Sequence, residues 1–490
     1  MITLLYSATD WFSAEIVYKA LVRSFAKNQV KRCLTSSLHF ENLKTGVFVF
    51  INPTEIDISK LPARSKIIVF GKMDTRIADK LQINLMTTDH TWTDQAVIHF
   101  DSTEGFDFPI KQRPFVRYDF PNEWNNLGYG AIQKNQCAWS IEHVAQSDYT
   151  IATITDQTIT SAYITLTDFQ DRSCVWINRT VGLVDSANWR FIEHFVSAYR
   201  FTELYSQAYL LDIPADCEMA ATMRLDCDED ILSAMPLFKA YKTENIPFSL
   251  AIKTSLPITE AEIDFFHQIQ KANGAILSHS VNHKVSWGVD YCDAFDEAYL
   301  SRMTLEQYAP TPFAVSPFHS NKIYAVKAME DAGYAGFIAG IIANDPEYLM
   351  ARGGAVPFAE KIVSHSQQCM MHGDCLLDEA DSLRIYKEAF DLALSSNTFF
   401  GFLDHPFSPR YQYGWKTETQ RIAAHLELIH YMQSQAEVLF LNENDCLHFM
   451  IDKSNATIQL NERNQPKLIV ENKQSTHPIG MSLNHKVMGS

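Results

Sequence analysis

Two acidic residues close an apolar stretch in the middle of the chain. Residues 220–231 read A-A-T-M-R-L-D-C-D-E-D-I, in which a β-prone half leads into Asp226 and Asp228. A carboxylate at the end of a core strand is costly unless a cation or a catalytic task uses its charge. Alternate strand residues share a face, so both carboxylates are expected on one side. Two such groups either raise the pKa of one of them or share a metal ion.

Two histidines, His279 and His283, follow another short apolar run and stand four positions apart. If the chain turns helical there, both imidazoles share a face and can bind one cation. Two histidines and one carboxylate, with positions left open, are typical of a catalytic rather than a structural metal site. A metal ion held there lowers the pKa of a bound water and polarises a carbonyl. A third apolar run ends in Asp404 and His405.

A β/α alternation has to position these residues. From about 206 to 450 the pattern predicts about seven or eight β/α units, which favours a parallel barrel with its functional groups at the strand ends. Thr259 and Glu262 form a capping box at the start of one helix. The predicted strands cover residues 220–227, 248–252, 275–278, 313–316, 336–341, 361–364, 399–403 and 438–441.

The remaining chain divides into three parts. Residues 1–105 alternate strand and helix and predict a small α/β domain, whose function the sequence does not reveal because no phosphate-binding glycine loop is present. Residues 106–205 are β-rich and close with an amphipathic helix at 186–204, and residues 451–490 form a short β-rich extension.

The composition excludes several classes. The 490 residues carry a net charge of −17 with no long basic run, which argues against nucleic acid or an anionic membrane surface as partner. The nine cysteines are scattered without a CxxC pair, as in a reduced, cytosolic protein. The chain begins on a strand rather than a signal sequence, and no apolar run is long enough to span a membrane, so a cytoplasmic location is expected.

The motifs resemble those of the NodB-type polysaccharide deacetylases, carbohydrate esterase family 4. The D-C-D triplet resembles a D-x-D variant of the first motif, H-S-V-N-H matches the second motif in full, and L-D-H matches the fifth. The resemblance covers about 210–445 and implies a distorted (β/α) barrel. It implies that Asp226 is the general base, that Asp228, His279 and His283 bind a divalent metal ion, zinc above others, and that His405 is the general acid.

The third and fourth motifs depart from the family pattern. Where the family has R-x-P-Y-G, this chain has V-S-P-F-H, so the arginine is missing and Arg224, on the same face of the strand as Asp226, is the expected substitute. The family's oxyanion-binding N–H would be that of Phe318. The acid that tunes the catalytic histidine has no clear match, with Asp345 and Asp374 as candidates.

For other conspicuous side chains, the sequence predicts a structural role or leaves two roles possible. The spacing of His365, Cys369, His372 and Cys375 matches no zinc pattern, so they are interpreted as structural. Trp287 and Trp415 follow two of the motifs and suit either a sugar groove or the core.

The sequence therefore predicts a metal-dependent hydrolase that removes N-acetyl groups from an amino sugar. Three alternatives stay open: a related deformylase or amidase acting on a non-acetyl amide, a glycosyltransferase that uses the D-x-D triplet, and a glycan-binding protein without activity. The particular sugar, the metal, the oligomeric state and the role of residues 1–205 are not encoded in these patterns.

Overall fold

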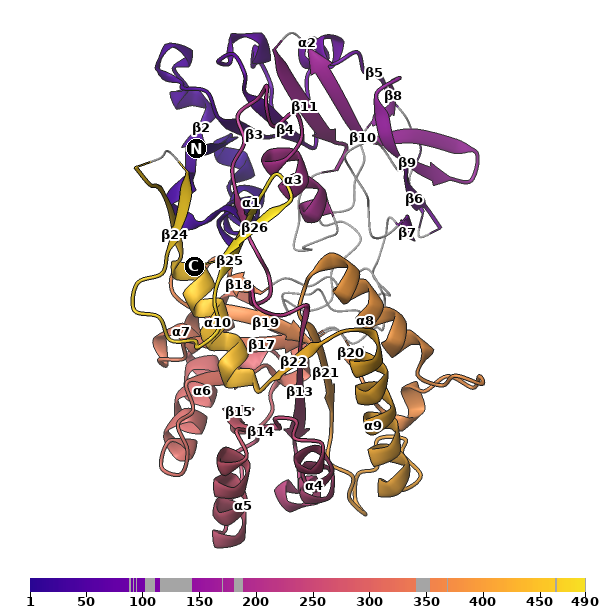
Figure 1. Cartoon of the computed structure of the whole chain (residues 1–490), viewed down its shortest axis with the longest axis vertical. Helices are drawn as coiled ribbons and strands as arrows, with labels where there is room; N and C mark the ends of the chain where they lie inside the picture. Colours follow the sequence, from indigo (N-terminus) through magenta and orange to yellow (C-terminus); the bar gives the residue numbers. More distant parts are fainter. Residues whose placement is uncertain are drawn as a thin grey trace.

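Two large sheets, one above the other in Figure 1, organise the chain. The computed structural model describes residues 1–87, 90, 92–93, 95–101, 111–114, 143–169, 171–179, 188–340, 353–367, 369–462 and 465–489. Asp345, one of the two candidate acids, lies outside these residues. The predicted α/β class is confirmed, since helices follow most strands of the lower sheet and several strands of the upper sheet.

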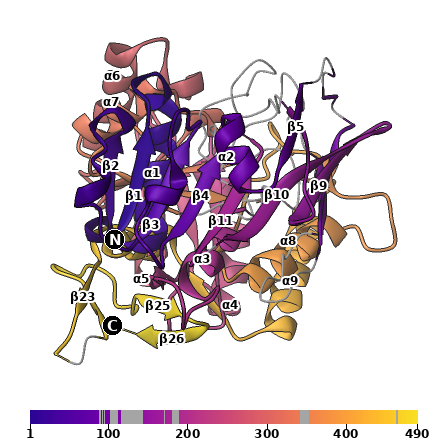
Figure 2. The same cartoon turned by 90° about the horizontal axis from the view of Figure 1, so that it is seen from above.

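The upper sheet has nine strands in the order β2-β1-β3-β4-β11-β10-β9-β6-β7, and Figure 2 shows them from above. β1 to β4 and β11 are parallel, whereas β10, β9, β6 and β7 continue antiparallel. β11 pairs with β4, so the predicted regions 1–105 and 106–205 share one sheet. Their division into domains stays a prediction. The strands are β1 (Ile2–Tyr6), β2 (Val30–Leu34), β3 (Val47–Ile51), β4 (Lys66–Phe70), β6 (Val97–Phe100), β7 (Gln112–Pro114), β9 (Thr150–Asp156), β10 (Ile159–Phe169) and β11 (Arg172–Ile177).

Three described helices and a small two-stranded sheet accompany this sheet. The helices are α1 (Trp11–Phe25), α2 (Thr75–Lys80) and α3 (Asn188–Ser197), and β5 (Asn84–Thr87) pairs with β8 (His143–Gln146). The helix expected over 186–204 is shorter, because α3 ends at Ser197 and turns follow. Trp189, Ile192, Phe195 and Val196, on the apolar face of this helix, are buried in the core. Tyr199, expected on the same face, lies beyond the end of α3 and packs partly buried against the same core.

The lower sheet carries the candidate site. Its order is β18-β19-β17-β16-β15-β14-β13-β21-β20, with β22 pairing β13. All ladders except β18–β19 are parallel. Among the described residues the order runs open from β18 to β20, and closure into a barrel stays a prediction. The strands are β13 (Met219–Cys227), β14 (Ser249–Ile252), β15 (Ala275–Ser278), β16 (Phe313–Val315), β17 (Gly336–Gly340), β18 (Gly354–Ala355), β19 (Val363–Gln367), β20 (Cys369–Met370), β21 (Phe400–Asp404) and β22 (Val438–Leu441).

Helices follow these strands where the sequence predicts them. The predicted capping box of α5 is confirmed, with the Thr259 side chain and the Glu262 carboxylate each bonded to the other's backbone N–H. α10 is not predicted by the sequence, although Asn442 caps it by accepting from the Asp445 N–H. The helices are α4 (Met235–Thr243), α5 (Glu260–Lys271), α6 (Tyr291–Leu305), α7 (Ile323–Asp331), α8 (Arg384–Ser396), α9 (Glu418–Gln435) and α10 (Glu443–Asn455).

The C-terminal segment returns to the upper half of the molecule (Figure 1, yellow). β25 (Gly480–Leu483) pairs with β26 (Lys486–Gly489) and with β12 (Tyr209–Leu210), and β23 (Thr457–Leu460) pairs with β24 (Pro466–Ile469). The side chains of Asn28 and Gln29 both donate to the Ile458 carbonyl. The extension is thus held by contacts with both earlier parts of the chain.

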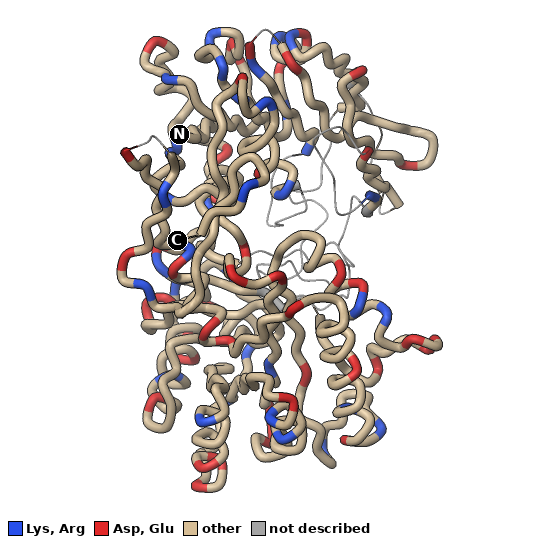
Figure 3. The backbone as a smooth tube through the Cα atoms, viewed as in Figure 1, with Lys and Arg blue, Asp and Glu red and all other residues tan. Residues whose placement is uncertain are grey.

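Charged residues of both signs are interspersed along the described chain (Figure 3). A buried ion network links the two halves: Asp212 accepts from Arg190 of α3 over 3.2 Å and from Lys453 of α10. None of the described helices is long and apolar enough to cross a membrane.

Candidate active site

β13 carries a buried ion pair near its C-terminal end. Arg224 donates from Nε to Oδ1 of Asp226 over 2.7 Å and from Nη2 to Oδ2 over 3.1 Å. The two side chains share a face because they lie two positions apart on a strand. Arg224 is 0% and Asp226 1% exposed, so solvent hardly screens the pair. The structure therefore brings Arg224 and Asp226 together.

Both acids of the D-C-D triplet are ionised at neutral pH. Burial alone raises the pKa of Asp226, but the charge of Arg224 outweighs it and holds that pKa well below its usual range. Burial is likewise outweighed at Asp228, where the neighbouring His279 lowers the pKa to about 2. Two neighbouring carboxylates were expected either to raise the pKa of one of them or to share a metal ion. The first of these does not occur here, since the pKa of each acid is lowered.

Cys227, between the two acids, belongs to the opposite face of β13. It is 1% exposed and packs in the apolar cluster beneath α4 and α5. Burial, together with the charges of Asp226 and Asp228, raises the pKa of the thiol well above its usual value. The alternation of β13 thus separates an inert thiol from the polar face.

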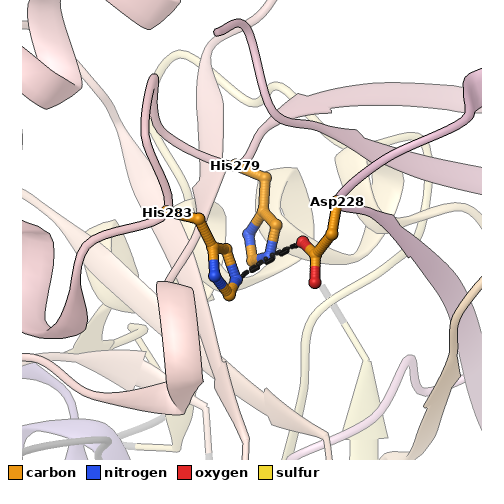
Figure 4. Close-up of side chains that lie close together, drawn as sticks. All are labelled: Asp228, His279 and His283. Atoms are coloured by element: carbon orange, nitrogen blue, oxygen red, sulfur yellow. Dashed lines mark hydrogen bonds and ion pairs between the residues drawn. The ribbon is translucent and has the colours of Figure 1, made fainter. Parts of the chain in front are cut away.

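Asp228, His279 and His283 converge on one point (Figure 4). The Oδ1 atom of Asp228 lies 3.4 Å from Nε2 of His279 and 3.4 Å from Nε2 of His283, and the two Nε2 atoms are 2.9 Å apart. Asp228 follows β13, and both histidines follow β15, which β14 separates from β13 in the sheet. The expected grouping of these three side chains is present.

The two histidines meet through a loop, not through a helix. Ser280 and His283 have φ of 64° and 56°, in the left-handed region, so the conditional expectation of a helical turn is wrong. Glu297 of α6 fixes this loop by accepting from the N–H groups of Val281 and Asn282 over 3.0 Å and 2.7 Å. Glu297 is 3% exposed, and nothing in the sequence marks it among ordinary helix residues.

These three side chains fit a divalent metal ion. Nδ1 of His279 lies 3.0 Å from the Val315 carbonyl, an arrangement in which Nδ1 carries the hydrogen and Nε2 presents a lone pair to the cluster. Oδ1 of Asp228 is buried and accepts no hydrogen bond among the described residues. Burial and the neighbouring His279 lower the pKa of His283 to about 4, so its ring is neutral. Two imidazole nitrogens and a carboxylate oxygen then face one another, an arrangement that a zinc-class cation stabilises.

Phe318 borders the cluster in a strained turn. It follows β16 within Pro317–His319, has φ of 52° and ψ of 24°, and is 45% exposed. Its ring centroid lies 4.6 Å from that of His283. A bulky residue rarely adopts a left-handed φ, so the surrounding structure must hold this backbone in place. Behind it, Nδ1 of His319 lies 3.5 Å from Nη2 of Arg224.

His405 approaches the cluster from the end of β21. Its Nε2 lies 3.7 Å from Oδ2 of Asp228, and its Nδ1 lies 2.8 Å from Nε2 of His372. The ring of Tyr413 stacks on His405 with centroids 4.3 Å apart. The partner of Nδ1 of His405 is therefore His372, which the sequence analysis interpreted as structural. Among the described residues, no acid occupies the position next to Nδ1 of His405. Asp374 lies in a group with His372 and Cys375 and makes no contact with His405 among the described hydrogen bonds.

Asp404 anchors the chain just before His405. It is fully buried, and its Oδ2 lies 3.0 Å from Nε2 of His425 while its Oδ1 accepts from the His405 N–H over 2.7 Å. Trp415 donates to Asp404 as well, over 3.3 Å. Trp415 and Trp287 are 1% and 0% exposed, so both belong to the core and neither lines a groove.

Comparisons with known proteins give only weak likenesses, and these are to solved structures. No family model matches the chain, and no curated protein matches its sequence. The solved structures that it resembles include carbohydrate deacetylases and family 4 carbohydrate esterases.

The carbohydrate deacetylase Agd3 matches with 10% identity and a TM-score of 0.40, over 98% of this chain and 93% of that one. A putative polysaccharide deacetylase from Mycobacterium smegmatis has 13% identity and a TM-score of 0.37, over 49% and 93%. Puue allantoinase has 13% identity and a TM-score of 0.36, over 48% and 91%. These likenesses are too weak to carry a functional argument, which rests on the side chains.

Proposed function

We propose that the protein is a metal-dependent hydrolase that removes an N-acetyl group from an amino sugar, in a distorted (β/α) barrel. The observation that carries the proposal is the convergence of Asp228, His279 and His283 beside the Arg224–Asp226 pair, with His405 across from them. A carboxylate and two imidazoles leave coordination positions open for water and substrate, as hydrolytic sites require.

Asp228, His279 and His283 would hold the ion, which supplies charge to polarise the amide carbonyl and to acidify water. Asp226 would accept the proton of the attacking water. Its depressed pKa keeps it ionised but makes it a weak base, so the transfer depends on a water that is already acidified. Arg224 would orient this carboxylate through its two hydrogen bonds, in the role of the absent third-motif arginine.

His405 would act on the leaving group of the reaction. His405 would protonate the departing amine, with His372 at its other ring nitrogen to fix the tautomer. The N–H of Phe318 would donate to the oxyanion, since the strained turn places this residue next to His283.

The glycosyltransferase alternative receives no support from the site. A D-x-D triplet that holds a metal–nucleotide complex needs both carboxylates free to bind it, yet both oxygens of Asp226 accept from Arg224. A hydrolase acting on a different amide uses the same residues, and only the substrate distinguishes it.

Acetate release from N-acetylated oligosaccharides by the zinc-loaded protein tests the proposal. We expect activity in the wild type, its loss in Asp228→Ala and His279→Ala, and no change in Asp264→Ala, where an exposed acid of α5 is removed. Activity that persists in both site variants would rule out this site. Release of formate from an N-formylated amino sugar, without release of acetate from the N-acetylated one, would favour the related deformylase.

A further inference from the structure

A second group of metal-type side chains lies in the interior of the lower sheet, apart from the catalytic cluster. His365 of β19 and Glu443 and Cys446 of α10 each present one ligand atom, and the three atoms lie within 4.8 Å of one another. The three residues are 1%, 0% and 0% exposed. None of them belongs to the site described above.

Rigid elements position these three side chains. Glu443 and Cys446 lie three residues apart in the first turn of α10 and therefore share a helix face. The start of α10 is fixed by the Asn442 cap and by the Glu443 N–H, which donates to Ser249 Oγ of β14 over 3.0 Å. His365 is fixed by Thr222 of β13, whose Oγ1 lies 3.2 Å from Nε2.

The chemistry of the group suits a thiophilic cation. An imidazole, a carboxylate and a thiol together are the ligand types that Zn²⁺ takes, with the thiol bound as thiolate. The Thr222 hydroxyl lies within hydrogen-bond distance of Nε2 of His365, so Nδ1 is the nitrogen that can bind an ion. Metal-bound histidines usually have such a hydrogen-bond partner at the nitrogen that does not bind the metal.

We propose that His365, Glu443 and Cys446 bind a second divalent ion of the zinc class, which joins β19 to α10. Full burial leaves no room for a substrate, so this ion serves the stability of the fold and takes no part in the reaction. The proposal does not depend on the proposed hydrolase function.

Cobalt(II) substitution of the full-length protein tests this site by a signal that the catalytic cluster cannot give. Only a thiolate ligand produces a near-ultraviolet sulfur-to-cobalt charge-transfer band, and Asp228, His279 and His283 contain no sulfur. We expect two ions per chain in the wild type, with this band present. The Asp228→Ala/His279→Ala double variant should retain one ion and the band.

Cys446→Ser should lose the band and one ion. Cys375→Ser is the matched control and should keep both, because Cys375 belongs to another group of metal-type side chains. Wild-type protein with a single ion and no band overturns the proposal, even if Cys446→Ser does not fold. A band that disappears in Cys375→Ser and persists in Cys446→Ser overturns it as well. His365→Asn, which keeps the thiol, should weaken the band.

Discussion

At the scale of single residues, the site depends on the Arg224–Asp226 pair. Both charges are buried, and each of the two hydrogen bonds uses a different carboxylate oxygen. Such a pair stabilises the protein little compared with apolar residues, but breaking it leaves an uncompensated charge in the core. The pair instead serves to position the Asp226 carboxylate beside the cluster of Asp228, His279 and His283.

Arg224→Met is expected to destabilise the protein by about 3–5 kcal/mol, since Asp226 is left buried without its partner. Arg224→Met/Asp226→Leu should regain most of this loss while remaining inactive. Urea unfolding of the wild type and both variants measures the difference. If the double variant is no more stable than the single one, the buried charge is not the cause.

His405→Ala is expected to lower kcat by about 10²–10⁴-fold, the range for loss of a general acid. His372→Ala should lower kcat less, and the combined variant should fall no further than His405→Ala because His372 acts through His405. Steady-state rates on an N-acetylated oligosaccharide measure this, with His430→Ala, an exposed histidine of α9, as the control. Independent, multiplicative losses would contradict the coupling.

The sequence could predict the residues of the motifs but not their partners. Arg224 was predictable because strand alternation places it with Asp226. His372 was not, since its contact with His405 joins positions 33 residues apart and depends on the pairing of β20 with β21. The loop at Ser280 was missed for a similar reason: Glu297 of α6 holds it, so its shape is set by tertiary contacts.

At the scale of elements, most strands of the lower sheet could be predicted, because short apolar runs bounded by polar turns mark buried parallel strands. α10 was missed although Asn442 and Asp445 offer a helix-start signal, since its residues lack a strong apolar period. The order of strands is not encoded locally, so the pairing of β11 with β4 was beyond prediction.

The α5 capping box gives a direct prediction. Thr259→Ala removes a side chain that accepts from the Glu262 N–H, and should cost about 1 kcal/mol of unfolding free energy. Thr259→Ser keeps the hydroxyl and should stay close to the wild type. Chemical denaturation compares the three proteins, and equal stability of the alanine and serine variants would contradict the cap's contribution.

Lys66 of β4 makes the stability of the upper sheet depend on pH. Burial, with the charge of Arg200, lowers the pKa of Lys66 from 10.5 to about 7. Between these values the unfolded chain binds the proton and the folded chain does not, so this residue makes stability rise as the pH increases from about 7 to 10.5.

Lys66→Met should therefore flatten the increase of unfolding free energy across this pH window, while Lys239→Met, which removes an exposed lysine of α4, should leave it unchanged. Urea unfolding at a series of pH values measures both slopes. Identical slopes in wild type and Lys66→Met would show that Lys66 stays protonated in the folded protein.

At the scale of the whole molecule, Asp212 connects the two halves by binding Arg190 of α3 and Lys453 of α10. Asp212→Asn removes the carboxylate that these two buried cations share and should cost about 3–5 kcal/mol. We expect calorimetry to show one unfolding transition in the wild type and a lower, divided transition in this variant. A single transition at the wild-type temperature would mean that other contacts couple the halves.

The position of Cys227 has a consequence for chemical attack on this protein. Peroxides and alkylating reagents react with the thiolate, and the raised pKa of Cys227 keeps it as the neutral thiol at neutral pH. β13 is therefore shielded from oxidative damage at Cys227, which lies between its two acids. If a thiol reagent does inhibit the proposed hydrolase activity, the modified cysteine must lie elsewhere in the chain.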